Sequence, residues 1–313
     1  MKKVVALAGG VGGAKLAWGL AQILSKDELT IIVNTGDDFT HLGLDISPDV
    51  DTVCYTLANL ANPETGWGRQ GESWNCLGEL KELGGPDWFN LGDLDLALHL
   101  ERTFLLQQGW SLTAATKYLC EKMGVVHVVL PMSDQQVRTL VSTVERGVLP
   151  FQEYFVKYHC EPTMTGVQFQ GIESAFLSEQ ASTALKECDI VIICPSNPWV
   201  SISPIIEIKD VKSILSTKTV VAVSPIIGGK TVKGPAAKMY AEMGIVPSAA
   251  AVAEQYERLI QGFVLDIVDE DQMQQIRQCG IIPFAVNTLM SDNSTREKLA
   301  RETLDFAERI KKV

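Results

Sequence analysis

Several features that mark particular protein classes are missing from this sequence of 313 residues. The seven cysteines form no CxxC pair, and their odd number and irregular spacing are typical of free thiols in a reducing compartment. We therefore expect no disulfide, no zinc site and no catalytic thiol. No uncharged apolar run reaches the roughly 18 residues that a membrane-spanning helix requires.

An excess of positive charge is also missing. Lysine and arginine together number 27 against 38 aspartates and glutamates, which gives a net charge of −11. A chain with this balance has no general attraction for nucleic acid or anionic lipid, so we expect neither as a partner. The start, MKKVVALA, superficially resembles a secretory signal, but its apolar run is too short and is better read as a buried strand. We expect a cytoplasmic protein.

Short runs rich in β-branched residues alternate with segments of helical periodicity. The runs begin near residues 3, 29, 125, 188 and 219, and each is followed by polar turn residues. This alternation predicts the α/β class, with a parallel sheet covered by helices on both faces. Ligands of such sheets bind beyond the carboxyl ends of the strands, where four polar turns of this chain should lie.

Two other regions have a different pattern. Residues 60–120 are helix-rich and contain no convincing strand, so we expect a helical insertion or lid within a single domain spanning 1–313. The runs FQEYFVKYH (151–159) and GVQFQGI (166–172) alternate in polarity and predict an antiparallel hairpin or sheet edge. The segment 294–313 predicts a closing amphipathic helix.

The first polar turn is rich in glycine. It follows the first predicted strand and contains Gly9, Gly10, Gly12 and Gly13, with Lys15 one turn into the next helix. Bare amides at the start of a helix suit a phosphate group. The spacing matches neither the dinucleotide fingerprint nor the P-loop, which excludes the usual NAD and ATP sites. A tight strand-to-helix turn without a ligand remains the alternative.

The second polar turn is acidic. NTGDDFTHLGLDISPDVDTV begins at Asn34 and contains five aspartates. Magnesium is usually held by one or two carboxylates together with phosphate oxygens, and a further carboxylate can accept a proton from an attacking hydroxyl. Turn formation and helix capping are the alternative roles for any one of them. The five are Asp37, Asp38, Asp45, Asp49 and Asp51.

Two later turns complete the predicted site. PSNP places Ser196 and Asn197 after the fourth predicted strand, as hydrogen-bond donors to a ligand. A second turn rich in glycine and lysine follows the fifth strand and includes Gly229, Lys230 and Gly234. Two anion-binding turns on one sheet favour a ligand with more than one negative group, such as a nucleoside diphosphate with an acidic appendage.

Taken together, the motifs resemble a known family, the 2-phospho-L-lactate or phosphoenolpyruvate transferases of coenzyme F420 biosynthesis (CofD-like proteins). The resemblance covers most of the chain in family order. It rests on ALAGGVGGAKL, VNTGDDF, PDVDTVCYTL, GWGRQGESWN, WFNLGDLDLALHLERT, VLPMSDQQVRT, FQEYFV, PSNPWVSISPI and AVSPIIGGKTVKGPAAKM.

The resemblance implies a Rossmann-like three-layer core with a mostly helical insertion, usually in a homodimer. It implies transfer of a phospholactyl or phosphoenolpyruvyl group from a guanosine diphospho-conjugate to the deazaflavin Fo, with Mg²⁺ required and GMP released. We expect Asp51 and Asp38 as catalytic residues, with Asp51 and Asn90 contacting Fo. The remaining expected ligand contacts are Gly9, Gly10, Gly12, Gly13, Lys15, Asn34, Ser196, Asn197, Gly229, Lys230 and Gly234. The expected metal ligands are Asp37, Asp38, Asp45 and Asp49.

One alternative comes from a different functional class. A non-catalytic regulatory protein of the same fold would bind a nucleotide sugar, and such proteins continue as DDGGSSG after the second strand. Here Phe39, Thr40 and His41 follow the two aspartates, which favours the transferase. A third reading, an NAD-dependent oxidoreductase, fails on the spacing of the glycines.

Overall fold

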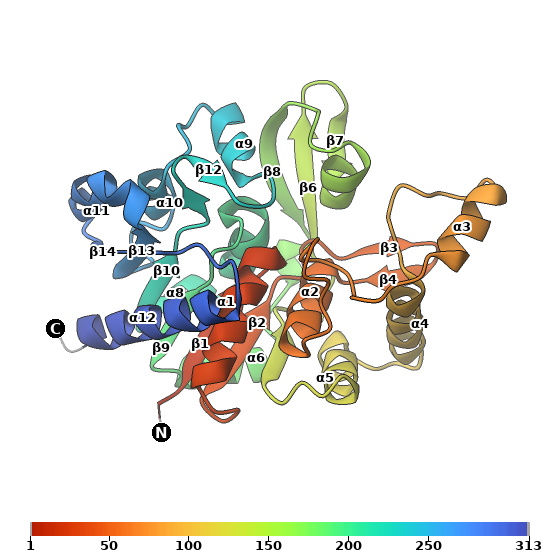
Figure 1. The fold of residues 1–313 in the computed structure, drawn as a ribbon, viewed down its shortest axis with the longest axis horizontal. Coiled ribbons are helices and arrows are strands. Elements are labelled where there is room, and N and C mark those ends of the chain that lie inside the picture. The colour runs from red at the N-terminus through yellow and green to blue at the C-terminus, as the bar shows by residue number, and fades with distance from the viewer. Residues whose placement is uncertain (1, 312–313) are drawn as a thin grey trace.

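The core of the protein is a seven-stranded sheet in which all neighbouring strands are parallel. A computed structural model describes residues 2–311 (Figure 1). The strand order is β14-β13-β10-β9-β1-β2-β5. The strands are β1 (Val4–Ala8), β2 (Leu29–Val33), β5 (Val128–Pro131), β9 (Ile190–Ile193), β10 (Thr219–Val223), β13 (Gly262–Asp266) and β14 (Ile282–Val286). The predicted α/β class is confirmed.

The strand order reverses beside β1. Val4 of β1 pairs with Leu29 of β2 on one side and with Ile190 of β9 on the other. Chain segments that leave β1 and β9 therefore diverge to opposite faces of the sheet, and a crevice opens between them at the carboxyl ends. In sheets of this type the crevice is where ligands bind.

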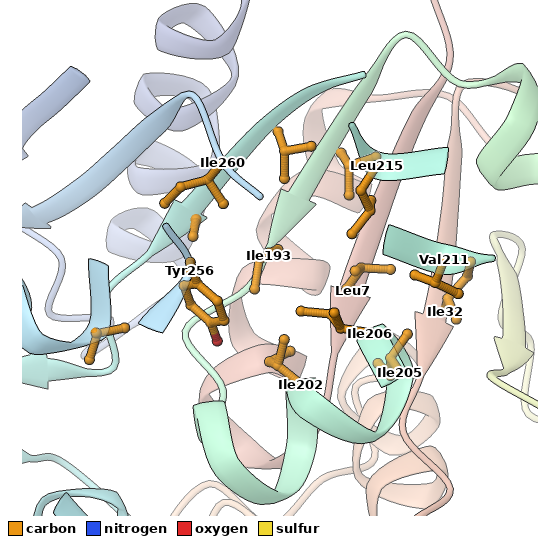
Figure 2. Packing of buried hydrophobic residues seen from close by; sticks show 14 of the residues in the cluster. Leu7, Ile32, Ile193, Ile202, Ile205, Ile206, Val211, Leu215, Tyr256 and Ile260 are labelled. Atoms are coloured by element: carbon orange, nitrogen blue, oxygen red, sulfur yellow. The ribbon is translucent and has the colours of Figure 1, made fainter. Parts of the chain in front are cut away.

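Helices cover both faces of the sheet. Successive side chains of a strand point to opposite faces, and here the side chains on both faces are apolar and need to be buried. Val4 and Ala6 of β1 pack under one layer, whereas Val5 and Leu7 pack under the other. The first layer contains α1 (Gly10–Ile23), α2 (Pro48–Leu57) and α12 (Asn293–Lys311). The second contains α6 (Glu179–Glu187), α7 (Ser203–Glu207), α8 (Val211–Leu215), α10 (Ala249–Gln255) and α11 (Met273–Gln278). Figure 2 shows this second core, where Leu7 and Ile193 of the sheet lie close to Ile202 and Ile206.

The predicted helical insertion is confirmed. It contains α3 (Asn75–Glu82), α4 (Asp93–Gln107) and α5 (Leu112–Lys122), which lie on the side of the molecule away from α11 and the C-terminus (Figure 1). A short hairpin, β3 (Phe39–His41) and β4 (Leu44–Ile46), precedes it. Strand β4 and α4 pack against each other, so the insertion is joined to the acidic turn.

The prediction that the runs 151–159 and 166–172 form an antiparallel hairpin or sheet edge is wrong for the first run. Residues 151–157 form a helical segment that includes the π-helix Glu153–Lys157, because Phe151 and Tyr154 are buried three positions apart on one face. The second run is a strand, β8 (Met164–Gln170), but it pairs with β6 (Arg138–Thr143). The third strand of this antiparallel sheet is β7 (Gly147–Pro150).

The remaining elements flank the crevice or connect the layers. They are β11 (Ile226–Ile227), β12 (Lys230–Thr231), α9 (Ala236–Glu242) and the short helical turns Ile172–Ser174, Pro198–Ile202 and Ile267–Gln272. The closing helix is confirmed as α12, and residues 312–313 of that prediction lie outside the described part of the chain. Within residues 2–311, no helix has the length and apolar character needed to cross a bilayer.

Candidate active site

The glycine turn and the acidic turn meet at the crevice beside β1. The backbone N–H of Gly10 donates to Asp49 Oδ1 at 2.7 Å, and that of Gly9 donates to Ser196 Oγ at 3.0 Å. Asn34 Nδ2 donates to the other oxygen of Asp49 at 2.9 Å. Segments that follow β1, β2 and β9 are thus joined in one hydrogen-bond network.

Because Gly9 and Gly12 have no side chains, the glycine turn can lie close to Asp49 and Pro195. A Cβ atom on Gly9 would lie 2.5 Å from Asp49 Oδ2, and one on Gly12 would lie 2.3 Å from the carbonyl oxygen of Pro195. Since Ser196 and Asp49 already accept from Gly9 and Gly10, those two amides are committed to protein. The amides of Val11 and Gly12 remain, because the first turn of a helix has no intrahelical acceptor for them, and both residues line the cavity described below. Free amides at the start of a helix are suited to bind an anion.

A cavity of about 800 Å³ opens over these turns. This is large enough for a nucleotide conjugate and part of a second substrate. Many of the residues predicted from the sequence line it. They are Gly9, Gly10, Gly12, Lys15, Asp37, Asp49, Asp51, Asn90, Ser196, Asn197 and Gly234.

The other predicted residues do not line the cavity. Asn34 is fully buried behind it and holds Asp49, and Gly13 packs against Ser196. Asp38 is buried and accepts from Ser47 Oγ at 2.8 Å. The last three are Asp45 on β4 and Gly229 and Lys230 on the β11–β12 hairpin.

Two buried carboxylates, Asp37 and Asp49, lie close enough at the cavity wall for their negative charges to repel each other. Burial raises the pKa of Asp37 well above its usual value, and the nearby Asp49 raises it further. Burial also raises the pKa of Asp49 to about 6, although Asn34 and Gly10 donate to it. Asp37 Oδ1 is buried and has no hydrogen-bond partner within residues 2–311.

A divalent cation would relieve this repulsion, and the oxygen donors suit Mg²⁺. In the described part of the chain, no three His, Cys, Asp or Glu side chains gather as a complete protein metal site. Two carboxylates are nevertheless sufficient where substrate phosphates supply further ligands. The residues present therefore fit Mg²⁺ bound together with a phosphorylated ligand.

This pair predicts a pH-dependent response to magnesium. The folded-state pKa of Asp49 lies above its unfolded value, so its contribution to stability is complete below about pH 4 and is lost as pH rises through 6. Mg²⁺ would bind this pair in its deprotonated form. We expect saturating Mg²⁺ with GDP to raise the melting temperature by about 5 °C more at about pH 8 than at about pH 5. Differential scanning calorimetry measures this, and an equal shift at both pH values would contradict it.

Basic side chains stand beside the glycine turn. Lys15 lines the cavity, and its Nζ donates to the carbonyl oxygen of Met290 at 2.9 Å. Burial lowers the pKa of Lys15, and the nearby charges of Arg296 and Lys233 lower it further. Lys15 and Lys233 thus bring positive charge to the cavity, although the protein as a whole is acidic. Lys233, a member of the predicted turn rich in glycine and lysine, also lines the cavity and contacts the carbonyl oxygen of Thr65.

Three polar side chains on α4 were not predicted from the sequence as site residues. Arg102 Nη1 donates to Asp51 Oδ2 at 3.0 Å, and its Nη2 contacts the other oxygen of Asp51. Nη1 also lies 3.1 Å from His99 Nδ1. Asp95, on the same helix, accepts from the hydroxyl of Tyr55 at 2.6 Å. The spacing of Asp95, His99 and Arg102, four and then three residues, places them on one helical face and was a signal available in the sequence.

Comparison with known proteins identifies the family. The sequence model of the family described as 2-phospho-L-lactate transferase CofD matches residues 4–304. A phosphoenolpyruvate transferase of Kitasatospora aureofaciens is 40% identical over 317 residues, covering 99% of both chains. A 2-phospho-L-lactate transferase of Methanococcoides burtonii is 38% identical over 303 residues, covering 97% of this chain and 99% of the relative.

A solved structure shares the fold at low sequence identity. It is a UPF0052 family protein of Bacillus halodurans, with a TM-score of 0.64, 15% identity, and coverage of 97% of this chain and 98% of that one. This likeness supports the predicted Rossmann-like fold alone. The family match and the relatives at 38–40% identity show more: the chain belongs to the CofD family of 2-phospho-L-lactate and phosphoenolpyruvate transferases of coenzyme F420 biosynthesis.

Proposed function

We propose that the protein transfers a 2-phospholactyl or phosphoenolpyruvyl group from a guanosine diphospho-conjugate to the terminal ribityl hydroxyl of Fo. The products are F420-0, or its dehydro form, and GMP. Family membership supports the class of reaction. The observation that carries the proposal is the 2.7 Å bond between the Gly10 amide and Asp49, which joins a phosphate-binding turn to a pair of carboxylates on one cavity.

The donor's diphosphate fits the glycine-turn end of the cavity. The amides of residues 11 and 12 lie at the start of α1, where the helix dipole favours an anion. Lys15 and Lys233 line the same end and supply positive charge. This arrangement holds the phosphorus atoms in place and counters the negative charge that accumulates during transfer.

Asp37 and Asp49 are the residues that would hold Mg²⁺. When bound there, the metal ion neutralises charge on the phosphate oxygens of the departing GMP. Asn34 fixes Asp49 from behind, because its Nδ2 also donates to the Val200 carbonyl oxygen at 3.2 Å. The carboxylate is therefore already oriented before substrates arrive, which lowers the cost of assembling the site.

The acceptor's flat ring system fits the aromatic part of the cavity. Trp67, Phe89, Phe151 and Phe155 line it. The rings of Phe151 and Phe155 are stacked with centroids 5.5 Å apart and planes 7° apart. Aromatic surfaces of this kind favour a planar heterocycle. Asn90 lines the same cavity and offers a polar contact to the ring substituents.

The transfer itself is a direct displacement at phosphorus. The Fo hydroxyl oxygen forms a bond to the phosphorus that bears the lactyl or enolpyruvyl group. The bond from that phosphorus to the bridging oxygen breaks, and its electron pair leaves with GMP. The hydroxyl proton passes to a base on the protein. No covalent enzyme intermediate is required.

Turnover with defined substrates tests this proposal. The purified protein is incubated with Fo, Mg²⁺ and each of three guanosine diphospho-conjugates, carrying lactate, enolpyruvate or glycerate. We expect stoichiometric GMP and an F420-0-type product by liquid chromatography and mass spectrometry, with one donor preferred. Tight binding of a conjugate without any GMP release would instead identify a regulatory binding protein and overturn the transferase.

A further inference from the structure

The proposed transfer needs a base for the hydroxyl proton, and two carboxylates of the cavity wall are positioned differently for this role. Asp51 lies on the first turn of α2, and its two oxygens are both engaged by the guanidinium of Arg102. Arg102 is 2% exposed. A proton on Asp51 would break a buried ion pair and leave the guanidinium without its counter-charge, which is costly. Asp51 is therefore poorly placed to accept a proton during turnover.

Asp95 has the opposite arrangement. Its Oδ1 accepts from the Tyr55 hydroxyl at 2.6 Å, which fixes the carboxylate. Its Oδ2 has no hydrogen-bond donor within residues 2–311, and the side chain lines the cavity. The helix start that carries Asp95 is held by Glu72, whose oxygens accept from the amides of Leu94 and Asp95 at 2.8 and 2.9 Å. One oxygen is thus anchored, and the other is available to a ligand.

The loop 66–68 connects this carboxylate to the phosphate end of the cavity. A Cβ atom on Gly66 would lie 2.8 Å from Val11 Cγ1, in the glycine turn. Two residues later, a Cβ atom on Gly68 would lie 3.6 Å from Asp95 Oδ2. The loop therefore joins the cavity wall that carries Asp95 to the glycine turn, and Val11, Gly68 and Asp95 all line the same cavity.

We propose that Asp95 is the general base of the transfer. Asp51 does not take this role, because Arg102 engages both of its oxygens. The inference rests on the proposed function. As the acceptor's hydroxyl oxygen bonds to phosphorus, its proton moves to Asp95 Oδ2, while the bridging P–O bond breaks toward GMP. Tyr55 is a positioning residue, since it acts on the substrate only through Asp95.

Several charged and titratable groups face Asp95. Burial raises the pKa of Asp95 to about 6, and the hydrogen bond from Tyr55 opposes that rise. Asp51 on α2 and Glu72 raise the pKa further, whereas Arg69 lowers it. A carboxylate that titrates near 6 is ionised at neutral pH and is a stronger base than an ordinary aspartate.

The pH dependence of kcat/KM tests the proposal. Assays use saturating Mg²⁺, so that the Asp37–Asp49 pair stays deprotonated throughout. The wild-type protein should show an acidic limb with a midpoint near 6. Asp95→Asn should lower kcat by roughly 10²- to 10⁴-fold and abolish that limb, with Fo affinity changed only a few-fold. Tyr55→Phe should move the limb to higher pH, because the hydrogen bond that lowers the pKa is gone.

Asp51→Asn is the matched comparison, since it removes the charge of the neighbouring carboxylate. Its activity should fall because Arg102 loses its counter-charge, but the acidic limb should persist. A limb that survives in Asp95→Asn, or that disappears in Asp51→Asn, would overturn the assignment. An unmoved limb in Tyr55→Phe would do the same even if Asp95→Asn failed to fold. A wild-type protein that releases no GMP would instead overturn the proposed function.

Discussion

Asp37→Asn should lower kcat/KM for transfer by about 10³-fold, or roughly 4 kcal/mol of transition-state stabilisation, without destabilising the fold. Asp37 lines the cavity, is 5% exposed, and has an oxygen with no partner within residues 2–311. The loss of activity follows because the substitution removes one of the two carboxylates that would hold Mg²⁺ against the donor phosphates.

The same substitution should leave the metal-free protein as stable as the wild type, or more stable. Burial and the charge of Asp49 raise the pKa of Asp37, so ionising it in the folded state is costly. At about pH 8 a neutral amide removes this cost, and we expect a melting temperature higher by about 2 °C without metal. With Mg²⁺ and GDP the order should reverse, because only the wild type gains the binding energy.

Asp45→Asn is the comparison for this prediction. Asp45 belongs to the same acidic turn but lies on β4 outside the cavity lining, with its amide bonded to Thr103 Oγ1 at 2.8 Å. Its kcat/KM should stay within about threefold of the wild type, since surface changes away from a site have small effects. Equal losses in the two variants would mean that the metal is held differently.

Arg102→Gln should lower the free energy of unfolding by about 3–5 kcal/mol. The guanidinium is buried between α4 and α2, where it pairs with Asp51 and also donates to the Asp45 carbonyl oxygen at 3.3 Å. Removing it leaves the Asp51 carboxylate buried without a cation. Because α4 belongs to the insertion, the loss should also weaken the attachment of the insertion to the core.

A double-mutant cycle separates this pairing from other effects. The variants are Arg102→Gln, Asp51→Asn and the two combined, each measured by urea denaturation followed by circular dichroism. The double variant should be more stable than the sum of the single losses predicts, by about 2 kcal/mol. Additive losses would show that the two side chains contribute independently and that the ion pair does not join α4 to α2.

The sequence correctly predicted the parts of the site that follow from the order of strands and turns along the chain. The polar turns were expected at the carboxyl ends of strands, and Gly10, Asp49 and Ser196 do meet there. Two strands, β13 and β14, were not predicted. The sequence of β14, IPFAV, is short and contains a proline, a residue that argues against a central strand. As the edge of the sheet, β14 tolerates it.

Other features depend on partners that are distant in the chain. The amides of Gly9 and Gly10 were expected to bind a ligand, but Ser196 and Asp49 accept from them. Asp51 was expected to be catalytic, and its pairing with Arg102, 51 residues away on another helix, was not expected. Residues 151–157 are helical because packing of Phe151 and Tyr154 favours one face, although the alternation of polarity in this segment also matched a strand. Tertiary contacts decided each of these cases.

The proposed mechanism depends on one centre in which the glycine turn and the Asp37–Asp49 pair act on the same diphosphate. A crystal structure with GDP and Mn²⁺, which substitutes for Mg²⁺ and is located by its anomalous scattering, tests this most directly. The proposed mechanism predicts one metal peak within about 2.2 Å of oxygens of Asp37, Asp49 and a GDP phosphate, with phosphate oxygens on the amides of residues 11 and 12. A metal bound elsewhere, or phosphates that lie away from those amides, would contradict it.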